Sequence, residues 1–313
     1  MKLLNYSKAI VLFLCICIRG TALEVMEVNE VSFTSAKSYS NPYIDVDLWI
    51  TLSGPNGESY KVPAFWDGGS IFRVRLVATS PGTWTWATDS STGDSGLDNK
   101  SGSFSATACT EAQKVANPNK RGFIRVRSGS QTLEYADGTP FFYTGDTVWV
   151  ALTKIFSWSS SSGEAEISFQ DYFTTRKNQG YNGVNIIACY PTDTVPSPAA
   201  EGVWHPDVRG EKISEQGRTP FSIINNEQAD YTNINVAYWQ EQDKKMQWFS
   251  DNGLVPMLET VRRHETWPYL STAQKNAFAN YVRYIWARYG CYNMIFSWVH
   301  VDINSVIKIL PVT

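Results

Sequence analysis

One unit recurs after about residue 140 and constrains the fold more than any other feature: a helical stretch, a glycine, then a short apolar run. The helical stretches end at Gly180, Gly253 and Gly290, and an apolar run follows each glycine within a few residues. Glycine ends a helix readily because it adopts a left-handed backbone without a steric penalty. Apolar strands that alternate with helices are typical of a parallel sheet covered on both faces. Together with an earlier apolar run, the predicted strands are residues 141–144, 184–189, 254–259 and 294–299.

This pattern predicts a domain of the (β/α)8 TIM-barrel type over residues 121–313, of which the sequence contains the first four βα units. A TIM barrel needs eight such units, spread over about 250 residues. We therefore expect either half of a barrel or a smaller open sheet. Half a barrel would leave sheet edges unpaired and apolar helix faces uncovered, so by itself it is expected to be poorly stable and weakly active.

Residues 23–112 follow a different pattern, because apolar and polar residues alternate within short runs and no long helical period occurs. The stretch YIDVDLWITL alternates strictly, with Ile44, Val46 and Leu48 on one face. Turn sequences such as GPNGE and SPG separate the alternating runs. We expect an antiparallel immunoglobulin-like β-sandwich here. Residues 113–120 are predicted to be a polar linker, and GFIRVR and QTLEYADGTP after it to be a small hairpin.

Residues 1–22 have the features of a secretory signal peptide. A basic start, with Lys2 and Lys8, precedes an apolar run over residues 9–18, and small residues follow at positions 20–22. This arrangement predicts cleavage and release to the periplasm or the cell exterior. The run is too short to span a bilayer and no later stretch is long enough, so we expect no membrane partner after cleavage.

Charge and the potential metal ligands exclude several kinds of partner. Three basic residues leave with the signal peptide, so 24 basic and 30 acidic residues remain, which argues against nucleic acid as a partner. Cys109, Cys189 and Cys291 remain without metal-type spacing, the three histidines form no cluster, and no glycine-rich phosphate loop occurs. We therefore expect neither metal nor cofactor. Cys189, inside an apolar run, is expected in the core.

Carboxylates lie at or after the ends of all four predicted strands in the second half. Functional residues of barrel-type folds gather at the carboxyl ends of the strands. The candidates, strand by strand, are Asp146 with Trp149, then Asp193, then Glu259, and last His300 with Asp302. Because parallel strands end at one rim, we expect these side chains to face a common site.

The loop after the second strand is long, from residue 191 to about residue 234, and contains EGVWHPDVRG. Long loops at such a rim often form a wall of the binding site, which makes Trp204 and His205 further candidates. Each candidate also has a structural interpretation. Asp146 could cap a turn or helix, Glu259 could pair with a nearby arginine, Trp204 could anchor its loop, and His205 could lie at the surface.

Paired carboxylates at one rim suit the hydrolysis of glycosidic bonds. One carboxyl group protonates the leaving oxygen, and the other attacks the anomeric carbon or activates water. Aromatic residues make up 14% of the chain, including 12 Trp, and flat aromatic rings with a polar handle suit the apolar face and polar rim of a sugar. Trp149 and Trp204 could stack on a sugar, while Asp146, Asp193, His205 and His300 could bind its hydroxyls.

The stretch DGTPFFYTGDTVW resembles the first barrel strand of the apiosidase-like glycoside hydrolases of the family 140 type. The preceding FWDGGSIFRVRLVATSPGTWTW is similar to an immunoglobulin-like domain of unknown function found before such barrels. The resemblance implies a secreted bacterial hydrolase of plant or algal polysaccharides with a TIM barrel and two catalytic carboxylates. One carboxylate is expected after the fourth strand, where Asp302 matches. The other is expected on a strand later than this sequence contains, so no nucleophile is assigned.

Three interpretations remain open at this point. The first is a glycoside hydrolase or a part of one, with Asp302 and Glu259 as catalytic candidates and an oligo- or polysaccharide as substrate. The second is a carbohydrate-binding protein without catalysis, and the third is a surface or adhesion protein. An inactive fragment is the outcome expected if the missing strands are essential. The sugar, the linkage, the stereochemical outcome and the oligomeric state are left open.

Overall fold

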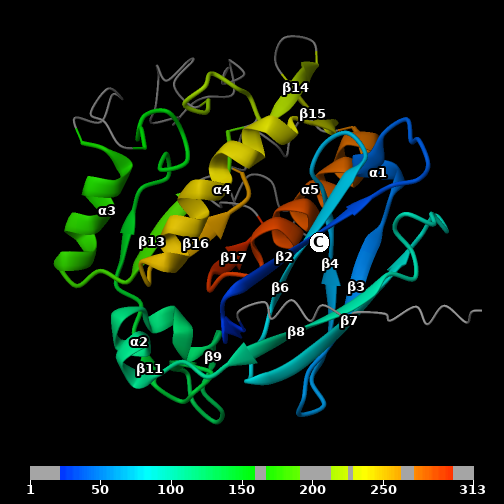
Figure 1. Cartoon of the computed structure of the whole chain (residues 1–313). Helices are drawn as coiled ribbons and strands as arrows, with labels where there is room; N and C mark the ends of the chain where they lie inside the picture. The colour runs from blue at the N-terminus through cyan, green and yellow to red at the C-terminus, as the bar shows by residue number, and fades with distance from the viewer. Residues whose placement is uncertain (1–21, 159–166, 191–212, 225–227, 262–270, 299–313) are drawn as a thin grey trace, which may run out of the picture.

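The computed structural model describes residues 22–158, 167–190, 213–224, 228–261 and 271–298 (Figure 1). The blue-to-cyan part is a β-sandwich of two sheets. The five-stranded sheet contains, in spatial order, β1 (Leu23–Glu24), β8 (Ser101–Thr107), β7 (Gly82–Ser90), β3 (Leu48–Ser53) and β4 (Ser59–Pro63). The three-stranded sheet contains β2 (Val28–Thr34), β6 (Ile71–Val77) and β5 (Phe65–Trp66). All neighbouring strands are antiparallel except β1 and β8.

The predicted alternation in the sandwich is confirmed from Leu48 onward. Leu48, Ile50 and Leu52 are buried between the sheets, and Trp84 from β7 is fully buried beside them. The prediction was wrong just before this strand, because residues 42–45 form a helical turn, α1 (Pro42–Asp45). Proline is favoured in the first turn of a helix, since its fixed φ suits that position and its missing N–H is not needed there.

Asp94 organises one edge of the sandwich through five hydrogen bonds. This fully buried carboxylate accepts from the backbone N–H groups of Ala36 (2.9 Å), Lys37 (3.0 Å) and Gly96 (2.7 Å) and from the hydroxyls of Ser35 (2.9 Å) and Tyr39 (3.0 Å). Burial alone would raise the pKa of Asp94, but the hydrogen bonds from Ala36, Gly96 and their neighbours outweigh it and hold the pKa well below its usual value.

We expect Asp94→Ala to lower the free energy of unfolding by about 2–4 kcal/mol, because several buried donors lose a charged acceptor. Denaturant unfolding followed by circular dichroism measures the change. Since the folded pKa is depressed, this contribution is present at neutral pH and disappears as the pH falls through that value. The exposed Asp89 on β7 provides the control, and Asp89→Ala should change stability by less than about 0.5 kcal/mol. Equal effects of the two substitutions would contradict this account.

The stretch predicted as a polar linker contains α2 (Glu111–Ala116) and a 3-10 turn, η1 (Pro118–Arg121). Thr110 and Gln113 form a capping box that begins α2. The side-chain amides of Asn117 and Asn119 donate to the carbonyl of Ser250 at 3.0 and 3.1 Å, so this stretch is tied to a helix of the second half. The hairpin predicted next is confirmed as part of an antiparallel sheet of β9 (Ile124–Val126), β10 (Leu133–Tyr135) and β11 (Pro140–Phe141).

The second half contains a parallel sheet whose strands follow one another in chain order: β12 (Gly145–Thr147), β13 (Gly183–Ile187), β16 (Val255–Glu259) and β17 (Ile295–Ser297). The helices are α3 (Phe169–Asn178), α4 (Val236–Asp251) and α5 (Thr272–Tyr289), and a hairpin of β14 (Phe221–Ile224) and β15 (Gln228–Ile234) precedes α4. The predicted alternation of strands and helices is therefore confirmed for the described residues. Among them, no helix has the length and apolar character that a bilayer crossing requires.

Two details of the second half differ from the sequence prediction. The first parallel strand is residues 145–147 rather than 141–144, because Phe141 pairs with the hairpin sheet and packs on Tyr135. The described helices share one core with one face of the sheet, rather than covering both faces. Right-handed crossovers between strands taken in sequential order place every helix on the same side.

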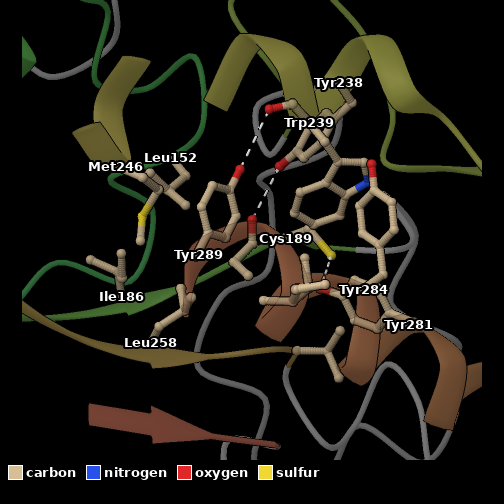
Figure 2. Close-up of a cluster of buried hydrophobic side chains, with 14 of the residues drawn as sticks. Leu152, Ile186, Cys189, Tyr238, Trp239, Met246, Leu258, Tyr281, Tyr284 and Tyr289 are labelled. Atoms are coloured by element: carbon tan, nitrogen blue, oxygen red, sulfur yellow. Dashed lines mark hydrogen bonds between the residues drawn. The ribbon is translucent and has the colours of Figure 1, made fainter. Parts of the chain in front are cut away.

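The core between sheet and helices is rich in tyrosines, as Figure 2 shows. Three of their hydroxyls donate to backbone carbonyls: Tyr289 to Trp239 (3.4 Å), Tyr238 to Ala188 (3.5 Å) and Tyr281 to Thr260 (2.8 Å). This pairing is what allows so many hydroxyl groups to be buried. Cys189 is fully buried among them, as predicted, with its sulfur 3.1 Å from the Tyr281 hydroxyl.

Buried charges join the sandwich to the helices. Arg75 of β6 and Arg288 of α5 both bind the carboxylate of Asp243 on α4, at 2.7 and 2.6 Å. Arg288 also pairs with Asp67, beside β5, at 3.0 Å. The guanidinium carbons of Arg75 and Arg288 lie 5.1 and 4.7 Å from the centroid of the Phe65 ring. The two halves of the protein therefore meet at a paired ionic junction rather than across a loose linker.

Candidate functional site

The carboxyl end of the parallel sheet carries a row of side chains that we call the upper row: Trp149, Ile187, Glu259 and Ser297. Ile187, Glu259 and Ser297 are register partners on β13, β16 and β17. The pairing of β12 with β13 continues past Thr147, since Val148 N–H donates to Asn185 O (2.9 Å) and Ile187 N–H donates to Trp149 O (3.1 Å). Trp149 and Glu259, two of the candidates from the sequence, therefore lie at the same level of the sheet.

The upper row lies on the face of the sheet that is turned away from the helices. Side chains alternate between the two faces of a strand. Val184, Ile186 and Leu258 are buried in the core shared with the helices, so their neighbours Ile187 and Glu259 point the other way. Glu259 is 5% exposed at the end of its strand. In a sheet that closes into a barrel, this face becomes the interior.

A second row lies one step below and contains Thr147, Asn185, Met257 and Ile295. Asn185 is a polar residue within the otherwise apolar strand GVNII. Its side-chain oxygen is buried and accepts no hydrogen bond in the described part of the chain. Together the two rows place a carboxylate, an indole, an amide and two hydroxyls on one face of one sheet. Uncharged hydrogen-bonding groups beside an aromatic ring suit a neutral ligand with many hydroxyls.

Tyr143 forms the floor beneath these rows. Its ring lies against Gly145 and Gly183, which are register partners on neighbouring strands. A β-carbon added at Gly145 would be 2.3 Å from the ring, and one added at Gly183 would be 2.2 Å from it. Burial, and then the negative charge of Glu259, raise the pKa of Tyr143 to about 12. Tyr143 packs in one small cluster with Val255 of β16 and Ile295 of β17.

We expect Gly183→Ala to lower the free energy of unfolding by about 1–3 kcal/mol, because the added methyl group displaces the Tyr143 ring. Chemical denaturation of the variant checks this value. In a Tyr143→Ala background the same substitution should cost little, since the clashing ring is gone, and the double-mutant cycle should show the coupling. An equal cost in both backgrounds would show that the ring does not require the glycine.

Asp146 lies elsewhere than the sequence suggested. It belongs to β12 itself, and its side chain is on the helix face, where its carboxylate accepts from the hydroxyl of Tyr172 (2.6 Å) and pairs with Nε of Arg176 (2.6 Å). Both partners are on α3. The reason is that the strand begins four residues later than predicted, so Asp146 lies within the strand instead of after its end, and the alternation of side chains turns it to the helix face. The structure thus brings Trp149 and Glu259 together and leaves Asp146 out of the row.

The remaining sequence candidates are Asp193, Trp204, His205, His300 and Asp302, and all five lie outside the described residues. Sequence reasoning missed Tyr143, Asn185 and Ser297. The polar Asn185 in an apolar strand and the two glycines that accommodate Tyr143 were the available signals. No group of three potential metal ligands occurs in the described ranges.

Two family models match the chain. The model described as "Apiosidase-like, catalytic domain" matches residues 127–304, which is more than half of the chain. The domain of unknown function DUF5060 matches residues 22–91, within the sandwich. A search of curated protein sequences returned no match.

Solved structures of glycoside hydrolases resemble the chain. A Bacteroides vulgatus protein provisionally assigned as a glycoside hydrolase matches with a TM-score of 0.61 and 19% identity, over 89% of this chain and 49% of its own. A second glycoside hydrolase matches with a TM-score of 0.40 and 20% identity, over 57% and 34%. A xyloglucanase from Bacteroides ovatus matches with a TM-score of 0.31 and 12% identity, over 93% and 56%. The first match shows a similar fold, and the chain spans about half the length of that protein.

Proposed function

The chain belongs to the apiosidase-like catalytic-domain family, and on that basis we propose that it is a secreted glycoside hydrolase, or a part of one, acting on plant or algal polysaccharide. The observation that carries the proposal is the upper row, where Glu259 and Trp149 share one level at the carboxyl end of a parallel sheet. A carboxylate supplies the acid–base chemistry of glycoside hydrolysis, and an indole supplies a stacking surface for a sugar ring.

The proposed fold of the catalytic part is a (β/α)8 barrel. Four parallel strands in sequential order, with the helices on one face, support this proposal, because these are the features of the first half of such a barrel. The helix-free face then becomes the barrel interior. The floor around Tyr143 and the hairpin sheet would close its amino-terminal end, and the upper row would open at the other end, where barrel enzymes bind their substrates.

The proposed mechanism uses two carboxylates on opposite sides of the glycosidic bond. Asp302 follows the fourth strand and is proposed as the acid that protonates the leaving oxygen. Glu259 is proposed as the second carboxylate of the site, in contact with the sugar at the point of cleavage. Asn185 and Ser297 would bind sugar hydroxyls, and Trp149 would stack on a ring. Asp193, Trp204, His205 and His300 remain proposed substrate-binding residues of the surrounding loops.

Sugar release from a panel of plant and algal polysaccharides tests the proposal. The chain from Leu23 to Thr313 is compared with its Asp302→Asn variant, and reducing sugar is measured after incubation. Release that is lost in the variant would support hydrolysis with Asp302 as the acid. Glycan binding by both proteins without any release would favour a carbohydrate-binding role. If the chain neither binds a glycan nor releases sugar, the proposed function for this chain is contradicted.

A further inference from the structure

Lys245 is a lysine of α4 whose side chain is almost completely buried, with 1% exposed. Its ammonium group donates to three backbone carbonyls, those of Ala151 (3.1 Å), Thr153 (3.0 Å) and Phe156 (2.7 Å). All three carbonyls belong to the segment of residues 150–156, which we call the β12 loop because it follows the last residues that pair with β13 beyond β12. Trp149, immediately before this loop, belongs to the upper row.

The β12 loop needs this lysine because its carbonyls would otherwise be buried without donors. Leu152 is buried in the core beside Met246 and Ile186, as Figure 2 shows, so the loop backbone passes close to the helices. The carbonyls of Ala151 and Thr153, which flank Leu152, are therefore directed toward α4. A buried carbonyl without a donor is costly, and an ammonium group is the side-chain donor that serves three acceptors at once.

The side chain of Lys245 remains a protonated ammonium group at neutral pH. Burial lowers the pKa of Lys245 to about 8, with Glu215 and Glu241 opposing that effect and Lys244 adding to it. The ring of Phe169 on α3 lies 5.2 Å from the nitrogen and adds a cation–π contact. At pH 7 the group is therefore charged, with three hydrogens for three carbonyls.

We propose that Lys245 is a positioning residue, whose ammonium group fixes the β12 loop and thereby the place of Trp149 at the end of the sheet. The anchoring of the loop is independent of any enzymatic activity. Its consequence for sugar binding rests on the proposed function, because it assumes that Trp149 is the stacking surface. If Trp149 is the stacking surface, weaker anchoring of the loop should lower the affinity for substrate. The rate at which the bound substrate reacts should change less.

Local hydrogen exchange of the β12 loop tests the proposal in the full chain. Lys245→Gln keeps two donors, and Lys245→Met keeps the length of the stem but has none. We expect amide exchange over residues 150–156 to be about tenfold faster in the glutamine variant and faster still in the methionine variant, since one hydrogen bond corresponds to about a tenfold change. Exchange in β3 and β7 of the sandwich should stay unchanged, which separates a local effect from loss of the fold.

The neighbouring Lys244 provides matched controls, because it is on the same helix and pairs with Glu215 at 2.9 Å near the surface. Lys244→Gln and Lys244→Met should leave exchange of the β12 loop unchanged. Unchanged exchange in both Lys245 variants would overturn the proposal. Slower exchange in the methionine variant than in the glutamine variant would also overturn it, because packing of the side-chain stem, and not the hydrogen bonds, would then hold the loop. If Lys245→Met does not fold, the comparison of Lys245→Gln with Lys244→Gln decides the question. Loop anchoring without any sugar binding would refute the proposed function and leave this inference intact.

Discussion

Glu259→Gln is expected to reduce sugar release by about a hundredfold to ten-thousandfold, the usual contribution of a catalytic carboxylate. Glutamine keeps the shape of the side chain but can neither accept a proton nor carry the negative charge. Glu259 lies at the end of β16, in the row with Trp149 and on the face away from the helices, so its loss should affect the chemistry more than the fold. Initial rates over a range of substrate concentrations, beside thermal unfolding of the same samples, measure both effects.

Glu134→Gln is the matched control for this substitution. Glu134 is on β10, in the hairpin sheet at the opposite end of the parallel sheet, and pairs with Arg125 at 3.0 Å. Its variant should release sugar at the rate of the unmodified protein. A Glu259→Gln protein that is folded and fully active would remove Glu259 from the proposed mechanism and leave Asp302 as the candidate carboxylate.

Asp243→Ala is expected to lower the free energy of unfolding by about 3–5 kcal/mol, because it leaves two buried guanidinium groups without their shared partner. The carboxylate accepts from Nη2 of Arg75 (2.7 Å) and from Nε and Nη2 of Arg288 (2.7 and 2.6 Å). The junction between the sandwich and the helices depends on these contacts. Denaturant unfolding should show a lower midpoint, and a changed slope would indicate that the two halves no longer unfold together.

Acid should weaken the same junction. Burial would raise the pKa of Asp243, but the charges and hydrogen bonds of Arg288 and Arg75 outweigh it and hold the pKa below its usual value. A depressed folded pKa means that the stabilisation is present above the unfolded pKa and is lost as the pH falls through the folded one. Asp243→Asn should therefore be less stable at neutral pH and lose less stability on acidification. The exposed Asp251 on the same helix is the control. Asp251→Ala should change neither the stability at neutral pH nor the loss of stability on acidification. The role of the junction would be contradicted if Asp251→Ala lowered the free energy of unfolding as much as is expected for Asp243→Ala. It would also be contradicted if Asp243→Ala left the free energy of unfolding unchanged.

The sequence pattern predicted the type of each half but not every boundary. Alternation in the sandwich and the helix–glycine–strand unit both arise from local periodicity, and these predictions are confirmed in the described residues except at α1 (Pro42–Asp45). The first parallel strand was misplaced because the aromatic residues 141–144 favour a strand more than Gly145-Asp146-Thr147 does. Pairing of Phe141 with Leu133 in the hairpin sheet decides between them, and that contact is not visible in local sequence.

The candidate site was predictable to the extent that it depends on strand ends. Glu259 ends its strand as expected, and Trp149 lies in the same row. Asp146 was assigned to the site because of the misplaced strand, whereas it belongs to the helix face. The partners of Asp243 and the carbonyls bound by Lys245 are distant in sequence, so neither the ionic junction nor the anchored β12 loop could be inferred from spacing. Such contacts depend on how the two halves and their loops pack.

Hydroxyl-radical footprinting of Trp149 with and without oligosaccharide tests the central claim most directly. The claim is that the carboxyl end of the parallel sheet, around Trp149 and Glu259, is where sugar binds. Oligosaccharides from the polysaccharide panel are added at saturating concentration, and oxidation of each tryptophan is read by mass spectrometry. We predict that sugar protects Trp149 and leaves Trp49 of the sandwich unchanged. Protection of Trp49, with Trp149 oxidised at the same rate as before, would contradict the claim and move sugar binding to the sandwich.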